Sequence, residues 1–155
     1  MKTFTDNTGR AWTIAINVDA VKRVKALAKV DLLEAVEGKL IERLVSDPVL
    51  LCDVVYCLCK PQADQLAVSD EDFGRAMAGD AIELATTALL EELVDFFPLG
   101  KRRLLQKALA KLKDWESKAM SVAEKKLDSP ELEAQFENAL KSIGGSSGNS
   151  PGSSG

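Results

Sequence analysis

Few residues in this 155-residue chain are of the types that carry out enzyme chemistry. The chain contains no histidine, which is the usual general base, the usual activator of a nucleophile and the commonest metal ligand. It also lacks a glycine-rich phosphate loop and a G-x-S-x-G turn. The sequence therefore predicts a protein that is not an enzyme and that needs no cofactor.

The three cysteines are the strongest candidates for a metal site. Cys52, Cys57 and Cys59 fall in an apolar segment that predicts a helix. On a helix, Cys57 and Cys59 point to nearly opposite sides, and only Cys52 and Cys59 share a face. Free cysteine behaves as a small buried hydrophobe, so we interpret all three as core residues and expect no metal. An odd number of cysteines and an N-terminus without an apolar signal segment indicate a reducing cytoplasm.

Two charged clusters could bind ligands. Asp70, Glu71 and Asp72 follow Ser69 and lack the spacing and glycine of a calcium loop, so we interpret them as a helix cap.

The second cluster is basic. It has no interleaved aromatic residues of the kind that bind single-stranded nucleic acid, and the chain carries a net charge of −4. We therefore expect a solvated face and no binding of nucleic acid, with an acidic protein partner as the alternative. The cluster consists of Lys101, Arg102, Arg103, Lys107 and Lys111.

Residues 80–97 predict the helix around which the rest of the chain is organised. Ile82, Ala85, Leu89 and Leu93 recur at spacings of three and four, and charged residues occupy the opposite side. Pro98 ends the helix. A helix with so wide an apolar face needs several partners.

The other segments predict those partners, and together they indicate a mainly α fold. Residues 4–17 predict a short hairpin, whose apolar face must lie on helices or be completed by another chain, and whose edge is a candidate pairing site between subunits. Asp31 caps a helix over 32–46 that contains Gly38, and the segment over 48–60 is apolar nearly all round, as in a central core helix. Residues 61–68 predict a connector. No apolar run reaches the roughly twenty residues of a membrane span, so we expect no membrane contact.

The C-terminal part predicts two helices and a tail. Residues 101–127 form a long helix with a heptad-like seam that includes Leu105, Leu112 and Trp115. A final helix follows Ser129. We expect one helical bundle of about six helices over 1–143, and a disordered Gly/Ser-rich tail or linker over 144–155. The seam packs either on the helix over 80–97 or on a partner.

Whole segments of the chain resemble the tail assembly chaperones encoded among the tail genes of long-tailed phages and prophages. The segments are FTDNTGRAWTIAINV, LLEAVEGKLIERLVSDPVLLCDVVYCLCKP, SDEDFGRAMAGD and LLEELVDFFP. The resemblance covers about residues 3 to 140. It implies a cytoplasmic, helical, non-enzymatic protein that binds the tape-measure protein during tail assembly and is absent from the mature virion. It also implies a longer, frameshifted form that recruits tail-tube subunits.

Large apolar residues on incompletely covered elements are the candidates for partner binding. Because a chaperone that coats a long partner acts in many copies, we also expect a homo-oligomer. The alternative function is a small structural protein of the virion or another helical adaptor. The candidate residues are Trp12, Ile14, Ile16, Leu112 and Trp115.

Overall fold

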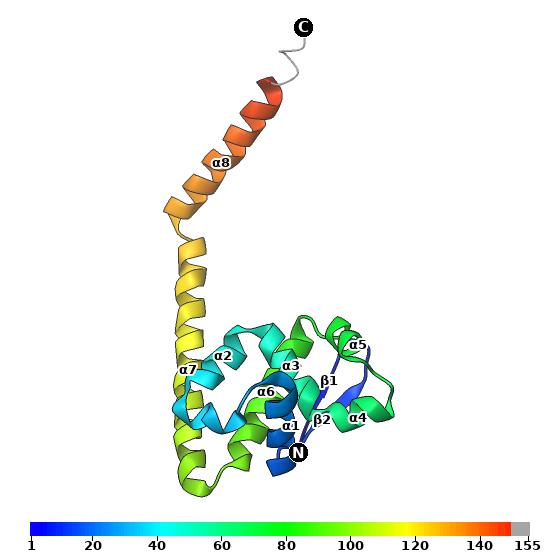
Figure 1. The fold of residues 1–155 in the computed structure, drawn as a ribbon. Coiled ribbons are helices and arrows are strands. Elements are labelled where there is room, and N and C mark those ends of the chain that lie inside the picture. The colour runs from blue at the N-terminus through cyan, green and yellow to red at the C-terminus, as the bar shows by residue number, and fades with distance from the viewer. Residues whose placement is uncertain (150–155) are drawn as a thin grey trace. The chain divides into compact units, whose positions relative to one another are not determined.

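The structure is a computed structural model that describes the backbone of residues 1–149 and the side chains of residues 1–143. The predicted fold class is confirmed: the described chain is mainly helical and begins with a two-stranded antiparallel hairpin (Figure 1). The chain divides into two compact units, Met1–Ala110 and Lys111–Gly155. The elements in chain order are β1 (Lys2–Thr5), β2 (Ala11–Ile14), α1 (Val18–Ala28), the 3₁₀ helix η1 (Leu32–Glu37), α2 (Lys39–Ser46), α3 (Pro48–Leu58), α4 (Lys60–Gln65), α5 (Asp70–Arg75), α6 (Asp80–Phe96), α7 (Leu99–Leu127) and α8 (Pro130–Asn149).

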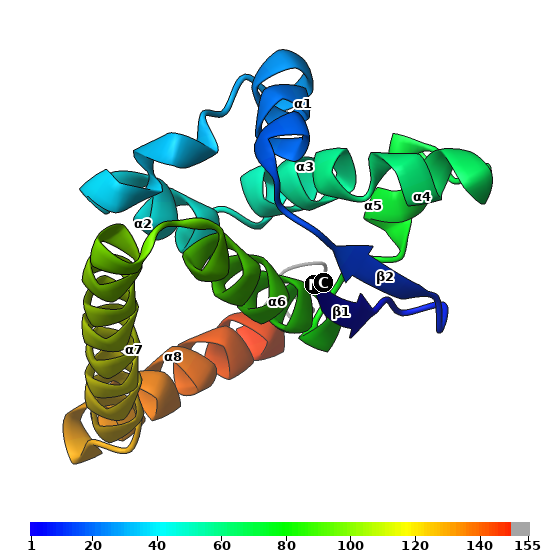
Figure 2. The same cartoon turned by 90° about the horizontal axis from the view of Figure 1, so that it is seen from below.

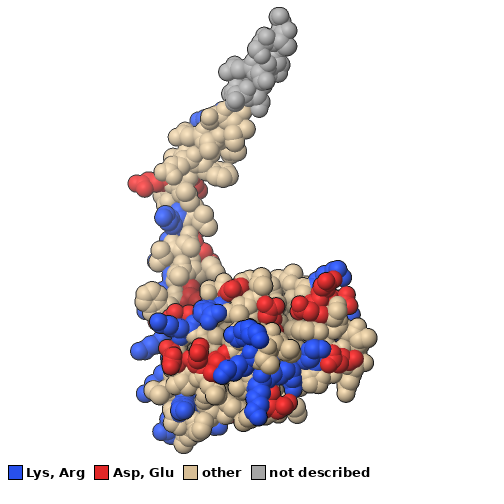
Figure 3. Space-filling view, in the orientation of Figure 1, with Lys and Arg blue, Asp and Glu red and all other residues tan. Residues whose placement is uncertain are grey.

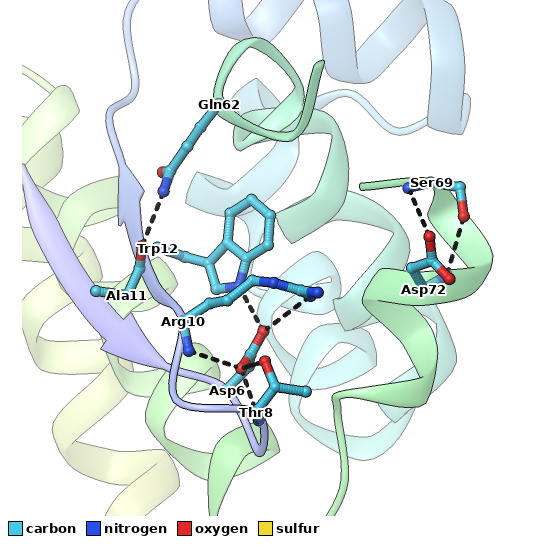
Figure 4. Close-up of polar contacts among 8 residues, drawn as sticks. All are labelled: Asp6, Thr8, Arg10, Ala11, Trp12, Gln62, Ser69 and Asp72. Carbon is cyan, nitrogen blue, oxygen red and sulfur yellow. Dashed lines mark hydrogen bonds and ion pairs between the residues drawn. The ribbon is translucent and has the colours of Figure 1, made fainter. Parts of the chain in front are cut away.

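The hairpin turn is built around a buried carboxylate. Asp6 Oδ1 accepts hydrogen bonds from the backbone N–H of Thr8 at 2.8 Å and of Arg10 at 3.1 Å, and from Thr8 Oγ1 at 2.7 Å. Its Oδ2 accepts from the indole Nε1 of Trp12 at 2.9 Å (Figure 4). Gly9 completes the turn at φ 87°, which favours glycine. Burial alone would raise the pKa of Asp6, but hydrogen bonds from Thr8, Trp12 and Arg10 outweigh it and lower that pKa below 3.8.

Helix α6 covers the hairpin on the side of β1 (Figure 2). Ala81, Ala85 and Ala88 share one face of α6 and are buried, and such small side chains allow a close approach between backbones. Further along α6, Glu92 Oε1 accepts a hydrogen bond at 3.4 Å from the backbone N–H of Ile16, a half-buried residue that follows β2. The predicted alternative in which helices cover the hairpin is therefore confirmed.

Helix α4 covers the other edge of the hairpin. Gln62 accepts a hydrogen bond from the backbone N–H of Thr13 at 3.1 Å and donates one to the carbonyl of Ala11 at 2.8 Å (Figure 4). The Cys59 thiol donates to the carbonyl of Thr13 at 3.5 Å. The groups that a free edge would offer to another strand are thus occupied within the chain, so the edge of β2 is not the subunit-pairing site that the sequence allowed.

Helix α3 lies at the centre of the first unit, where it packs against α1, α2, α4, α5 and α6. Asp47 caps its start by accepting from the backbone N–H groups of Val49 and Leu50. At its end, Arg23 of α1 donates to the carbonyls of Cys57 and Leu58, where a cation also complements the helix dipole. The central position predicted for this apolar segment is confirmed.

The structure contains more helices than the six that the sequence predicts, for two local reasons. Gly38 adopts φ 86° and ends η1, so the helix expected over 32–46 is divided in two. In η1 the buried residues are Leu32 and Ala35, whereas Leu33 is exposed. Second, the connector expected over 61–68 begins with α4, because Pro61 occupies the first helical turn, where its missing N–H costs no hydrogen bond.

The C-terminal part of the chain continues as helix. The division between the two units falls between residues 110 and 111, within α7. Helix α8 extends to Asn149, into the segment expected to be a tail over 144–155. Residues 150–155 of that expected tail lie outside the described residues.

Replacing Asp6 with alanine should lower the free energy of unfolding by about 3 kcal/mol, because the buried indole N–H and two backbone N–H groups lose their acceptor. The exposed Asp95→Ala should change it by less than about 0.5 kcal/mol. Since the pKa of Asp6 is lower when folded, the stability that it contributes is present above pH 3.8 and lost as the pH falls further. Urea unfolding at several pH values should show a larger loss in the wild type than in Asp6→Asn.

Replacing Gln62 with leucine should lower the free energy of unfolding by about 1–2 kcal/mol, because Thr13 N–H and the Ala11 carbonyl lose their partner. Gln65→Leu on the same helix is the matched control, since Gln65 is exposed and takes no part in these bonds. Urea unfolding of both variants checks this. Equal stability of the two would show that α4 does not protect the strand edge.

Candidate partner-binding surface

The structure separates the five residues that the sequence proposes for partner binding. Trp12 and Ile14 are both 0% exposed and lie in the core of the first unit, and Ile16 is half-buried. Trp12 packs edge to face on Phe73 of α5, with ring centroids 5.2 Å apart. The expectation that the hairpin face lacks cover is therefore wrong: it is the centre of a closed core.

Trp115 has the opposite environment. It is 75% exposed on α7, and Leu112, one turn before it, is half-exposed. Of the seam predicted on α7, Leu105 is 1% exposed and belongs to the core of the first unit. The seam thus packs within the chain only at its start. No residue among 111–143 is buried.

Two stripes of apolar side chains lie beyond Ala110, while Met120 and Leu127 are exposed outside them. The α7 face consists of Leu112, Trp115, Ala119 and Val122, and the α8 face of Leu132, Phe136, Ala139 and Leu140. The spacings of three and four place each set on one side of its helix. Phe136 is 67% exposed and Leu140 55%, and on the visible side of Figure 3 the described part of α8 is largely uncharged. The α8 face was not among the binding residues expected from the sequence, although the spacing of its apolar residues indicates it.

Exposed large apolar residues also occur singly in the first unit, such as Val18, Val49 and Leu84, but on these two faces they recur along one side of a helix. Soluble monomers rarely expose a contiguous apolar stripe without using it for binding. In α7 the flank of the stripe is basic, and Lys118 forms an ion pair with Asp114 at 3.0 Å on the exposed surface, which contributes little stability. The arrangement fits a partner helix that lays its own apolar face along the stripe.

The other candidates for chemistry have structural roles in the described residues. Cys57 and Cys59 are buried, Cys52 is half-buried, and burial raises the pKa of Cys59 to about 12, so its thiol stays protonated. Among the described residues, no three acidic, cysteine or histidine side chains are placed to hold a metal ion. Ser69 and Asp72 form the predicted helix cap, a capping box (Figure 4).

One member of the basic cluster has a structural role, and the others are exposed. Arg102 donates from Nε to the carbonyl of Phe97 at 3.2 Å and from Nη2 to that of Asp95 at 3.3 Å, which satisfies the end of α6. The other four members are exposed. No helix in the described range 1–149 combines the length and hydropathy needed to cross a membrane.

Comparisons with known proteins do not assign the chain to a family. No protein-family model, curated protein or solved structure matches it.

Trp12→Ala should lower the free energy of unfolding by about 3–5 kcal/mol, because it leaves a cavity in a closed core and removes the partner of Asp6. Trp115→Ala should lower it by less than about 0.5 kcal/mol, because its side chain is exposed. Thermal and urea unfolding of the two variants test this contrast. A large loss of stability in Trp115→Ala would place that residue in a core.

Proposed function

We propose that the protein is a non-enzymatic assembly chaperone that binds a helical segment of another protein along the α7 and α8 faces. One observation carries the proposal: the first unit closes its own core, whereas on the two faces Trp115 is 75% exposed, Val122 64%, Phe136 67% and Leu140 55%. Exposed apolar surface is what a chaperone offers to an aggregation-prone client. The stripe geometry favours an amphipathic helix as the bound segment.

The client that we propose is the tape-measure protein of a long-tailed phage. This protein is long and rich in amphipathic helices, so its soluble state requires cover along much of its length. The resemblance of the four quoted segments to tail assembly chaperones supports this choice. A longer form of the chain would then recruit tail-tube subunits, and the protein would act in the bacterial cytoplasm and be absent from the mature virion.

The proposed binding residues differ from those expected from the sequence alone. Leu112 and Trp115 remain, and Phe136 joins them. Trp12 and Ile14 are left out because a client could reach them only if the core opened, and Ile16 because its half-buried side chain lies beside them in the chain. A tryptophan is a suitable anchor, since aromatic residues dominate interface energetics.

Co-expression with the tape-measure protein encoded in the same gene neighbourhood tests the proposal. We expect the wild-type chain to keep that protein soluble and to co-purify with it. Trp115→Ala combined with Phe136→Ala should reduce the recovered partner at least tenfold, because both anchors are lost. The control is Leu84→Ala, which truncates a half-exposed apolar residue of α6 in the first unit.

Two results would contradict the proposal. An insoluble partner that does not co-purify with the wild-type chain would exclude the chaperone function for this client. Recovery of the chain from purified virions, in amounts stoichiometric with other tail proteins, would instead support a structural or adaptor protein.

A further inference from the structure

The α7 face carries a row of lysines along one flank. If Leu112 and Ala119 are heptad positions a, then Trp115 and Val122 are positions d, and Lys111, Lys118 and Lys125 all fall at position g. Each of these lysines is exposed. Position g lies beside the seam, where it contacts the flank of a helix packed in parallel. The α7 face is thus a hydrophobic stripe with a positive border.

The α8 face has the complementary border. Leu132 and Ala139 fall at positions d and Phe136 at position a, which places Glu133 at position e and Glu137 next to it on the same side. Both glutamates are exposed. In a parallel pair of helices, position g of one contacts position e of the other. The next position e is Leu140 and Glu137 is at position b, so Glu133 is the one carboxylate in the described part of α8 that meets a position-g lysine.

We propose that α8 of one copy packs in parallel on α7 of a second copy of this chain. The register that joins the borders puts Lys111 beside Glu133 of the second copy. The same register pairs a large side chain with a small one in two successive layers, Phe136 with Ala119 and Val122 with Ala139, as close packing requires. Trp115 then covers Leu132.

The connector between the two helices excludes this arrangement within one chain. Only two residues, Asp128 and Ser129, separate α7 from α8, and they span about 10 Å at most. Parallel packing in this register would require the chain to return from Leu127 to the level of Trp115, twelve residues or about 18 Å back along α7. The short connector allows only an antiparallel hairpin, in which the g positions of α7 would meet the uncharged Gln135 and Ser142 rather than a carboxylate.

Pairing of two α7 helices fits less well. Lys126 falls at the next a position of the seam, so two copies of α7 in register would bring two lysines together in the interface. In the mixed pair of α7 with α8, Lys126 lies opposite Ile143 instead. Charge does not distinguish the two pairs, because Lys111 meets Glu133 in the mixed pair and Glu116 in the α7 pair. The two lysines at position a are what makes the α7 pair less favourable.

Every copy carries both faces, so the contact is heterologous. If two copies each pack α8 on the other's α7, they form a closed dimer. If each copy packs its α8 on α7 of the next copy, they form an open row of copies. The self-association needs no client, and its test is separate from that of the proposed function. A client that binds the same faces would compete with it.

Sedimentation of the purified chain over a range of concentrations tests the inference. We expect concentration-dependent association, weakened at least tenfold by Phe136→Ala, which removes an interface anchor, and by Ala119→Phe, which places two phenylalanines in one layer. The double variant should recover most of the affinity because it restores one large and one small residue. Leu84→Ala is the control, and circular dichroism checks that each variant keeps its helices.

Cysteine cross-linking tests the register. A mixture of Val122→Cys with Ala139→Cys should form a disulfide-linked pair of chains on oxidation by a copper catalyst and oxygen, whereas the wild type should not. A chain that remains monomeric at about 100 µM would overturn the inference. So would association that is indifferent to Phe136→Ala and Ala119→Phe, or efficient cross-linking of Val122→Cys with itself, which would indicate pairing of two α7 helices.

Discussion

A two-stranded sheet cannot cover its own apolar face, and the first unit is organised by that constraint. Helix α6 lies along β1 through three alanines, Gln62 of α4 occupies the edge of β2, and Phe73 of α5 packs on Trp12. The buried carboxylate of Asp6 fixes the indole that these helices surround. The helices therefore depend on the hairpin for a common surface as much as the hairpin depends on them for cover.

Periodicity and helix caps predicted most of the fold, because they are local. Asp31 and Ser69 each accept the expected backbone hydrogen bonds, and the helix over 80–97 has nearly the expected bounds. The predictions were wrong where the same residue is compatible with two local structures. Gly38 lowers helix propensity in either case, and only the packing around it decides that the backbone turns there. Charged residues of the helix over 80–97 were expected on its outer side, yet Glu92 is buried, and its carboxylate accepts a hydrogen bond from the Ile16 N–H and pairs with the Met1 amino group.

The candidate surface shows what a single sequence leaves open. Trp12 and Trp115 both stand at apolar positions of a periodic pattern, and the pattern alone does not say whether another element covers them. Trp12 is covered because the chain returns to it several times, at α4, α5 and α6. No described segment returns to the stripe from Leu112 onward. Residue type and spacing therefore predicted that an apolar stripe exists on α7, but not which part of it lies in a core.

This difference in cover also determines what constrains each part of the chain over evolutionary time. A substitution in the core of the first unit is tested by folding itself, since the cavity or clash that it creates costs stability in every cell. A substitution on the α7 or α8 face leaves the fold intact and is tested only when the surface meets what it binds. The stretch from Leu112 to Leu140 is therefore free to follow changes in a binding partner while the hairpin and its helices stay the same.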